Sequence, residues 1–202
     1  MLIQINEELI NIIHYYVVTK LTAEEGVIYS GTITGCVNKV FSALYGEKGY
    51  KGIEDRAGAI LYSIVHGHSF TDGNKRTGLL TTCLFLYFNG KLLKPPQDSA
   101  KFLEKMADAE DPNAPTEIDA IEWVKRHTSS SLSSSFINVI LTFYCKTQGW
   151  AYLRQLTRTI LDMDILPYVN KETLVDRKLL ETRKQKWKNR SSSEDAKSGQ
   201  KT

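Results

Sequence analysis

The chain has 202 residues, of which 42% are hydrophobic and 24% are charged. This composition suits one hydrophobic core with an appendage, or two small domains, and argues against a disordered or fibrous protein. The first residues carry no basic stretch ahead of an apolar run, and no segment approaches the roughly 18 apolar residues that span a bilayer. We therefore expect a soluble, cytoplasmic protein with no membrane partner.

The formal net charge of +3 is unevenly distributed. Residues 1–128 contain 13 Lys and Arg against 16 Asp and Glu, a net charge of −3, whereas residues 129–202 contain 13 against 7, a net charge of +6. The cysteines Cys36, Cys83 and Cys145 are widely spaced and form no CxxC pair. They indicate buried free thiols rather than a disulfide framework or a structural zinc site.

The first part of the chain has helical periodicity. Asn6 is a suitable N-cap, two glutamates favour the first turn, and apolar residues recur at helical spacing until a stop before Gly26. Residues 27–35 differ, because β-branched and aromatic residues are combined with glycines placed for a turn. They predict a short hairpin or flap with a free backbone edge, followed by a short helix over residues 37–45.

The middle of the chain predicts an all-α fold. Residues 53–66 place their apolar side chains on one face of a helix. The next helix, from about Asn74 to just before Gly90, is apolar almost all round, which is typical of the buried central helix of a bundle. Residues 102–109 and 118–127 predict two shorter helices.

A serine-rich stretch, Thr128–Ser135, is the best candidate for a linker or domain edge. Residues 136–144 and 152–165 beyond it are apolar enough to pack as helices, whereas Arg177–Arg190 is strongly basic and residues 191–202 are polar. The expected organisation is a main helical domain at residues 1–128, a C-terminal helical extension at 129–176, and a basic, partly disordered tail at 177–202.

The residues that carry chemistry gather between two predicted helices, in the order His68, Phe70, Asp72, Gly73, Asn74, Lys75, Arg76. The first turn of a helix has N–H groups without carbonyl partners and the positive end of the helix dipole, so a loop that leads into it can hold a phosphate group. Gly73 lets the backbone approach the anion, and Asn74 can cap the helix or contact phosphate. The two cations that follow add positive charge.

Two further residues suggest a reaction. Asp72 offers the oxygen ligand that Mg²⁺ prefers beside substrate phosphates, and His68 is the nearby group whose ordinary pKa suits a general base. Each residue also has a structural interpretation, since single histidines near helix ends are usually structural and Asp-Gly-Asn is a common turn. Their joint spacing favours phosphoryl or nucleotidyl transfer, with Phe70 as the anchor of the loop in the core.

The segment His68–Arg76 resembles the Fic/Doc family motif HxFx(D/E)(G/A)N(G/K)R at every defined position. The resemblance implies an all-α domain with a flap ahead of the motif, which transfers part of a nucleoside triphosphate to a protein hydroxyl. It implies the following roles: His68 as the base, Asp72 as the Mg²⁺ ligand, Gly73, Asn74 and Lys75 as the anion hole, and Arg76 as a phosphate clamp.

Two positions make the segment similar to the death-on-curing, or Doc, branch. Lys75 and Leu79 stand where adenylylating Fic enzymes usually have glycine and a second arginine. In the Doc branch ATP is thought to bind inverted, so that the γ-phosphate is transferred and the enzyme is a protein kinase. Gly73 departs from the alanine that Doc toxins often have. The resemblance covers roughly residues 5–127.

The resemblance also bears on partners. An inhibitory (S/T)xxxE(G/N) signature is missing, because Leu21 occupies the Ser/Thr position ahead of Glu25-Gly26, so a separate antitoxin is expected. The flap at residues 27–35 would pair with an extended segment of the target, which the family suggests is a translation elongation factor. The basic stretch 177–190, with Trp187, offers contact to nucleic acid or the ribosome, although such runs are more often solvated.

Three alternatives remain open from the sequence. The first is a protein adenylyltransferase that attaches AMP or another nucleotide to the hydroxyl. The second is a catalytically silent module that binds protein or nucleic acid, against which the complete motif argues. The third is a transition-metal site at His66 and His68, for which the sequence offers no third ligand.

Overall fold

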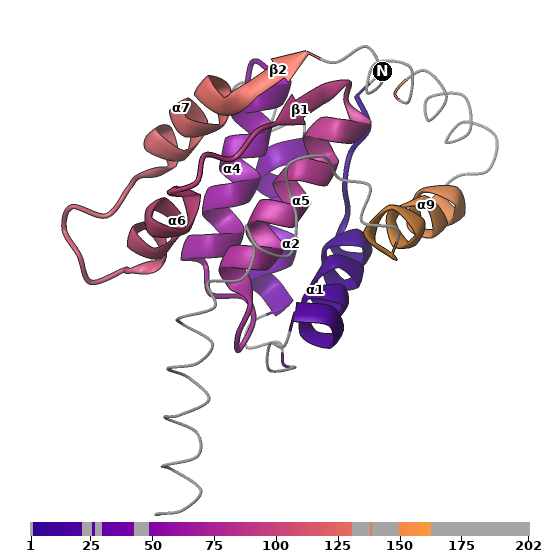
Figure 1. The fold of residues 1–202 in the computed structure, drawn as a ribbon, viewed down its shortest axis with the longest axis horizontal. Helices are drawn as coiled ribbons and strands as arrows, with labels where there is room; N and C mark the ends of the chain where they lie inside the picture. The colour runs from indigo at the N-terminus through magenta and orange to yellow at the C-terminus, as the bar shows by residue number, and fades with distance from the viewer. Residues whose placement is uncertain are drawn as a thin grey trace, which may run out of the picture.

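The computed structural model describes residues 2–21, 26, 30–42, 49–130, 138 and 150–162. In this part of the chain the regular elements are helices, apart from two short strands, which confirms the all-α class (Figure 1). The elements are α1 (Glu7–Leu21), α2 (Ser30–Phe41), α4 (Ile53–His66), α5 (Asn74–Phe88), β1 (Lys91–Leu93), α6 (Ser99–Ala107), α7 (Glu117–His127), β2 (Thr128–Ser130) and α9 (Trp150–Asp162).

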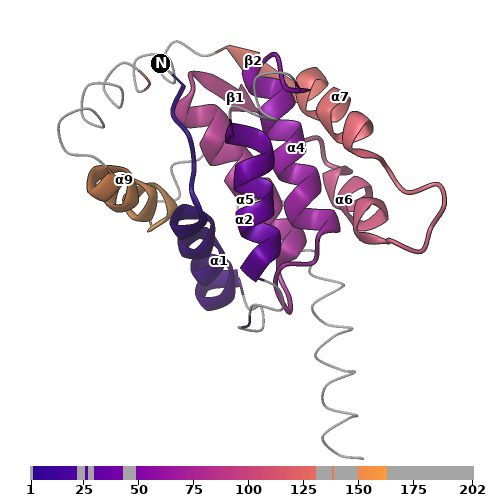
Figure 2. The same cartoon turned by 180° about the vertical axis from the view of Figure 1, so that it is seen from behind.

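Helix α5 is the centre of the fold, as its apolar character predicts. Its side chains are buried from Thr77 to Phe88. Gly78 allows α5 to approach α4 closely, because a Cβ atom there would lie 2.7 Å from Cγ2 of Val65. Helices α6 and α7 lie on the side of α4 away from α1, and α9 lies beyond α1 on the other side (Figures 1 and 2).

Helix α7 also packs very closely on α4. A Cβ atom at Gly58 would lie 2.4 Å from the Cα atom of Ile121, so only glycine fits at this crossing. Cys36 and Cys83 are buried free thiols, as predicted, and burial raises the pKa of Cys36 to about 12. Cys145 lies outside the described residues.

The hairpin or flap predicted over residues 27–35 is wrong where the structure describes it. Residues 30–35 belong to α2, and residues 27–29 lie outside the described part. Ile33, Cys36 and Val40 are buried at helical spacing, and this burial outweighs the low helix propensity of the glycines in α2. The helix predicted over 37–45 therefore starts earlier and ends at Phe41.

The serine-rich stretch begins as a strand. β2 pairs antiparallel with β1, with Lys91 opposite Ser130 and Leu93 opposite Thr128. Lys94 N–H extends the ladder by donating to the carbonyl of His127 at 2.8 Å. Because residues 128–130 are part of this sheet, we propose that any domain edge lies after residue 130 rather than at 128.

Helix α9 confirms the predicted helix over 152–165 as far as residue 162, where the described segment ends. Its buried side chains pack toward α1, and Arg154 Nη1 lies 2.7 Å from Glu8 Oε1. The helix predicted over 136–144 lies outside the described residues except for Asn138, and the basic stretch 177–190 lies wholly outside them. No helix in the described ranges is long and apolar enough to cross a bilayer.

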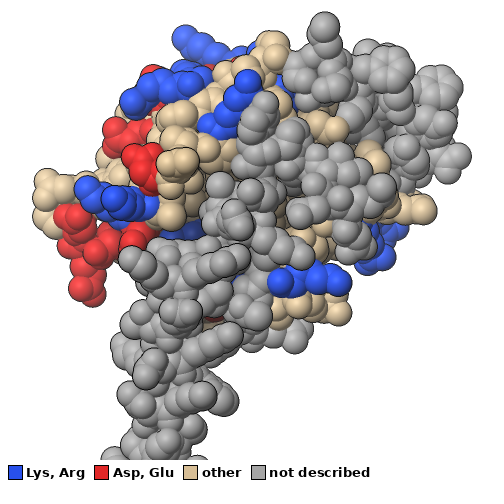
Figure 3. Space-filling model, viewed as in Figure 1, with Lys and Arg blue, Asp and Glu red and all other residues tan. Residues whose placement is uncertain are grey.

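Acidic side chains gather at the edge of the molecule formed by the connection from α6 to α7 (Figure 3). Asp108 and Glu110 are exposed in this connection. Their position agrees with the net negative charge counted over residues 1–128.

Candidate active site

The motif forms the connection between α4 and α5. Helix α4 ends at His66, and α5 begins at Asn74 directly after Gly73, which has a left-handed backbone with φ 79° and ψ 6°. A side chain at this backbone conformation would be strained, whereas glycine adopts it freely. The loop therefore ends in a tight turn at Gly73, and the backbone of residues 72–73 leads directly into the first turn of α5.

The side chain of Asn74 fixes the shape of the loop. Its Oδ1 accepts the N–H of Phe70 at 2.9 Å, and its Nδ2 donates to the carbonyl of Phe70 at 2.6 Å. The amide group thus pairs with both backbone polar groups of one residue. The N–H groups of the first turn of α5 are left to face the loop, because a helix supplies no carbonyl partners for them.

Phe70 anchors the loop in the core, as predicted. It is 1% exposed, and its ring stacks on the ring of His14 with centroids 3.7 Å apart and planes 10° apart. Nδ1 of His14 lies 3.2 Å from Oγ1 of Thr77 on α5. The aromatic pair therefore joins α1, the motif loop and α5 beneath the candidate site.

His14 is a residue that the sequence analysis missed. Burial lowers its pKa to about 4, an effect that the charge of Asp72 opposes and that of Arg76 reinforces. The imidazole is therefore neutral near pH 7. The available signal was its spacing, since His14 lies four residues after Ile10 and three before Val17, both of which are buried.

Asp72 and Arg76 form an ion pair at the loop. Oδ1 of Asp72 accepts the N–H of Gly73 at 2.6 Å, and Oδ2 lies 3.5 Å from Nη2 of Arg76. The exposed fractions of these side chains are 25% and 14%. A carboxylate and a guanidinium thus stand one helical turn apart at the start of α5, which suits a cation and a phosphate group respectively.

His68 lies at the surface, with an unusual backbone. Its φ is 44°, and no other non-glycine residue among the described ones has a positive φ. Its side chain is exposed, and Nε2 lies 2.8 Å from the carbonyl oxygen of Ala107 at the end of α6. The structure therefore places the predicted base beside the motif loop with its ring held by a neighbouring helix.

His66 is held in a related way. Its Nδ1 lies 3.2 Å from the carbonyl oxygen of Met106, and its ring stacks on Tyr62 at 4.8 Å. One nitrogen of each ring of the His66–His68 pair is thus occupied by a backbone carbonyl. Within the described ranges, no three His, Cys, Asp or Glu side chains gather in a way that could hold a metal ion.

Lys75 and Leu79 follow Asn74 on α5. Lys75 is partly exposed in the first turn, next to the loop. Leu79 is 2% exposed and belongs to the core. The predicted site residues from His68 to Arg76 therefore lie in the loop and the first turn of α5, whereas Leu79 lies one turn further along α5, in the core.

Gly26 brings the segment before α2 against the motif. Its carbonyl accepts the N–H of Thr71 at 3.0 Å. Its φ is 156°, and a Cβ atom would lie 2.3 Å from Oγ1 of Thr71. Although residues 30–35 form no flap, the chain just ahead of residue 27 does contact the loop through its backbone.

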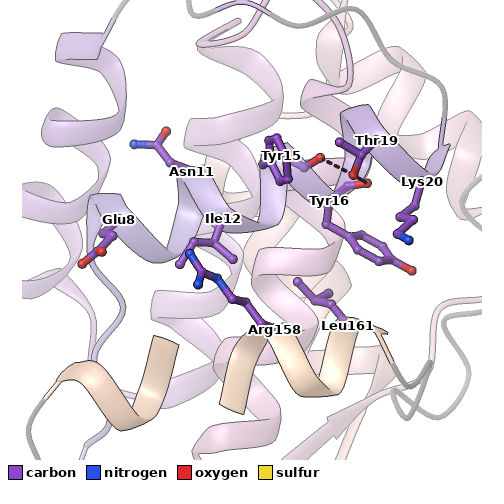
Figure 4. Close-up of a pocket in the computed structure, with 9 residues that line it drawn as sticks. All are labelled: Glu8, Asn11, Ile12, Tyr15, Tyr16, Thr19, Lys20, Arg158 and Leu161. Carbon is purple, nitrogen blue, oxygen red and sulfur yellow. Dashed lines mark hydrogen bonds between the residues drawn. The ribbon is translucent and has the colours of Figure 1, made fainter. Parts of the chain in front are cut away.

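A pocket of about 570 Å³ lies elsewhere, between α1 and α9 (Figure 4). Arg158 and Leu161 of α9 reach toward Ile12 and Tyr16 of α1 in this view. Its lining includes no residue of the motif. The candidate active site is therefore the motif loop with the first turn of α5, and this pocket is a separate feature.

Comparison with known proteins agrees with this location. Residues 4–86 match the Fic/DOC family. A stretch of 60 residues is 35% identical to Toxin Doc of Mycolicibacterium smegmatis; it covers 30% of this chain and 46% of that protein, so the match spans about half of the relative's length. The family match includes α1, α2, α4 and most of α5, the elements that carry and support the motif. Residues 4–86, which contain the motif, are therefore the part of this chain that is similar to the Fic/DOC family.

Proposed function

We propose that this protein transfers the γ-phosphoryl group of ATP to a hydroxyl group of a target protein. The observation that carries the proposal is that one loop holds the exposed imidazole of His68 and, four residues later, the Asp72–Arg76 pair at the first turn of α5. In the proposed reaction His68 accepts the hydroxyl proton and the hydroxyl oxygen bonds to the γ-phosphorus. The bond from that phosphorus to the bridging oxygen breaks, and ADP leaves.

The cations and amides at the start of α5 suit the charge of this reaction. Arg76 would hold phosphate oxygens through its N–H groups, and the first-turn N–H groups with Lys75 would hold a second phosphate. His14 supports this arrangement from the core, because its ring stacks on Phe70 and its Nδ1 contacts Oγ1 of Thr77. Because these groups are already in position, little reorganisation is needed when charge develops on the phosphoryl group.

The residues also fit a bound Mg²⁺ ion. Asp72 is a partly exposed carboxylate at the start of α5, and one or two carboxylates with substrate phosphates are the usual protein contribution to a Mg²⁺ site. When bound, the ion would neutralise charge on the phosphate oxygens. The proposed role of this chain is to hold it through Asp72.

Lys75 supports γ-phosphoryl transfer over nucleotidyl transfer. A lysine side chain in the first turn occupies space that a glycine would leave open for a phosphate group, and it adds a positive charge there. The alternative is adenylyl transfer, in which the hydroxyl oxygen attacks the α-phosphorus and pyrophosphate leaves. The two reactions use the same base and differ in the orientation of the nucleotide.

The name of the relative supports a toxin role, with a separate antitoxin as partner. The backbone bond between Gly26 and Thr71 marks where an extended target segment could lie against the loop. We propose a component of translation, such as an elongation factor, as the target. Contact of residues 177–190 with nucleic acid or the ribosome is a further part of this proposal.

The test uses ATP labelled at either phosphorus. Purified protein is incubated with cell extract, Mg²⁺ and α-³²P-ATP or γ-³²P-ATP, in parallel with His68→Ala and with Gln155→Ala, an exposed substitution on α9. We expect γ-label to enter a protein with wild type and Gln155→Ala, and a loss of roughly 10²- to 10⁴-fold with His68→Ala. Label from the α position instead would establish the adenylyltransferase alternative, and no His68-dependent label from either would reject both.

A further inference from the structure

Two histidines rest on consecutive carbonyl groups of one helix end. The last turn of α6 presents the carbonyl of Met106 to Nδ1 of His66 at 3.2 Å and that of Ala107 to Nε2 of His68 at 2.8 Å. The two histidines come from α4 and from the loop after it. The end of α6 is therefore the external support of the segment that carries the proposed base.

The backbone of His68 makes this support necessary. A φ of 44° is a left-handed conformation that is uncommon for residues other than glycine, and such conformations persist where surrounding contacts over-determine them. Gly67 just before it packs against Thr32 and the carbonyl of Ser63, since a Cβ atom there would lie 2.6 and 2.3 Å from them. The direction of the His68 ring is thus set by its contacts on α6 and by the close packing of the preceding residue.

The hydrogen bond also decides which ring nitrogen is available. A carbonyl oxygen only accepts, so Nε2 of His68 has to donate, and in a neutral imidazole the proton is then on Nε2 and the lone pair on Nδ1. The same argument gives His66 the opposite tautomer, because there Nδ1 donates to Met106. We infer that His66 and the last turn of α6 hold His68 so that its Nδ1 is the atom that accepts the substrate proton.

This inference rests on the proposed function and adds a positioning residue to it. The hydroxyl proton moves to Nδ1, and the ring becomes an imidazolium whose Nε2–H still donates to Ala107. Nδ1 then returns its proton to solvent, so that the next turnover starts from the same tautomer.

Helix α6 is rigid enough to act as this support. Met106 is fully buried and Leu103 is 4% exposed. Phe102 stacks on Trp123 of α7 with centroids 5.2 Å apart and planes 9° apart. Helix α6 lies after residue 86, where the family match ends, so the support of the base comes from outside the matched segment.

The first measurement reads the tautomers directly. Two-bond ¹H–¹⁵N correlation spectra of the full-length protein report which imidazole nitrogen is protonated, and the His68→Ala spectrum assigns the signals. We expect the Nε2–H form for His68 and the Nδ1–H form for His66. His127 is an internal control, since its Nδ1 lies 2.7 Å from the carbonyl of Trp123 and should also carry the proton. A dominant Nδ1–H form of His68 would overturn the inference.

The second measurement tests His66 through activity. His66→Leu removes the donor to Met106, whereas His66→Asn places an amide N–H close to the position of Nδ1. We expect His66→Leu to lower kcat for γ-phosphoryl transfer roughly 10- to 100-fold with little change in the KM for ATP, and His66→Asn to restore most of it. Equal kcat for wild type and a folded His66→Leu would reject the positioning role.

The two measurements separate the inference from the proposed function. The tautomers are read without substrate and do not depend on whether transfer occurs. If wild type transferred no label, the proposed function would fail, and with it the role of Nδ1 as a base. If wild type transferred label and His68 were in the Nδ1–H form, only the present inference would fail.

Discussion

The motif loop and helix α9 are attached to the protein in different ways. The loop is held from three sides: Phe70 stacks on His14 of α1, the Asn74 amide of α5 binds the Phe70 backbone, and Ala107 of α6 binds His68. Helix α9 contacts mainly α1, through a buried face and the exposed ion pair of Arg154 with Glu8. Changes beneath the loop should therefore alter the whole fold and the site, whereas changes on α9 should stay local.

The largest expected effect is the loss of the anchor. Phe70→Ala removes a ring that is 1% exposed and stacked on His14, and we expect it to lower the free energy of unfolding by about 3–5 kcal/mol. Denaturant unfolding followed by circular dichroism measures this loss. Thr71→Ala, at the exposed neighbouring residue, should change stability by less than about 0.5 kcal/mol. Equal losses for both variants would show that the loop is not held from the core.

The next effect is a pH dependence that originates at His14. Its pKa is about 4 in the folded protein and 6.5 ordinarily, so between these values the unfolded chain binds more protons. The free energy of unfolding should therefore fall as pH falls from 6.5 to about 4, by up to about 3 kcal/mol. Asp72 and Arg76 act on His14 in opposite directions, so the loss of either charge would move this window.

The matched variant for this dependence is His14→Phe, which keeps a ring against Phe70 and removes the titrating group. We expect its unfolding free energy to change less between pH 6.5 and 4 than that of wild type. Denaturant titrations at a series of pH values provide the comparison. An unchanged slope in His14→Phe would assign the dependence to other groups.

A smaller and local effect is expected on α9. Leu153 is fully buried, and Leu153→Ala should destabilise the packing of α9 on α1 by about 2–3 kcal/mol, the low end for a buried leucine, because α9 contacts mainly one other helix and can adjust on it. Hydrogen exchange should become faster in α9 and stay slow in α5. Faster exchange throughout α5 would mean that α9 stabilises the whole core, and that changes on α9 do not stay local.

The smallest effect concerns the ion pair of Arg154 and Glu8. Their side chains are 41% and 48% exposed, so Arg154→Ala should cost at most about 1 kcal/mol, and less at high salt. Melting temperatures of this variant and of Glu8→Ala at two salt concentrations would measure the difference. A larger, salt-independent loss would show that Arg154 contributes by packing instead of by charge.

The helices and the site loop were largely predictable from the sequence. The apolar pattern of residues 74–88 identified the central helix, and the turn residues of the motif gave the position of the loop. Residues 30–35 were predicted wrongly because Gly31 and Gly35 suggest turns, although both lie in α2 with open space where a Cβ atom would be. The buried spacing of Ile33, Cys36 and Val40 was the better signal.

Other features could not be read from local sequence. Residues 128–130 form a strand because β1 lies opposite, and a serine-rich segment has little strand propensity of its own. His66 and His68 are held by the backbone carbonyls of Met106 and Ala107 respectively, which any residue type would provide. Contacts of this kind depend on where α6 lies in the folded protein. The residue types at positions 106 and 107 do not predict that position.

The pairing of β1 with β2 closes the segment between them into a loop whose two ends are neighbours. The strands bring the two ends of residues 94–127 side by side, with Lys94 N–H bonded to the carbonyl of His127. The helices between these ends belong to the core, because α7 packs on α4 where Gly58 meets Ile121. Because α6 lies within this segment, substitutions in residues 94–127 would change how His68 is supported and leave every residue of the motif as it is.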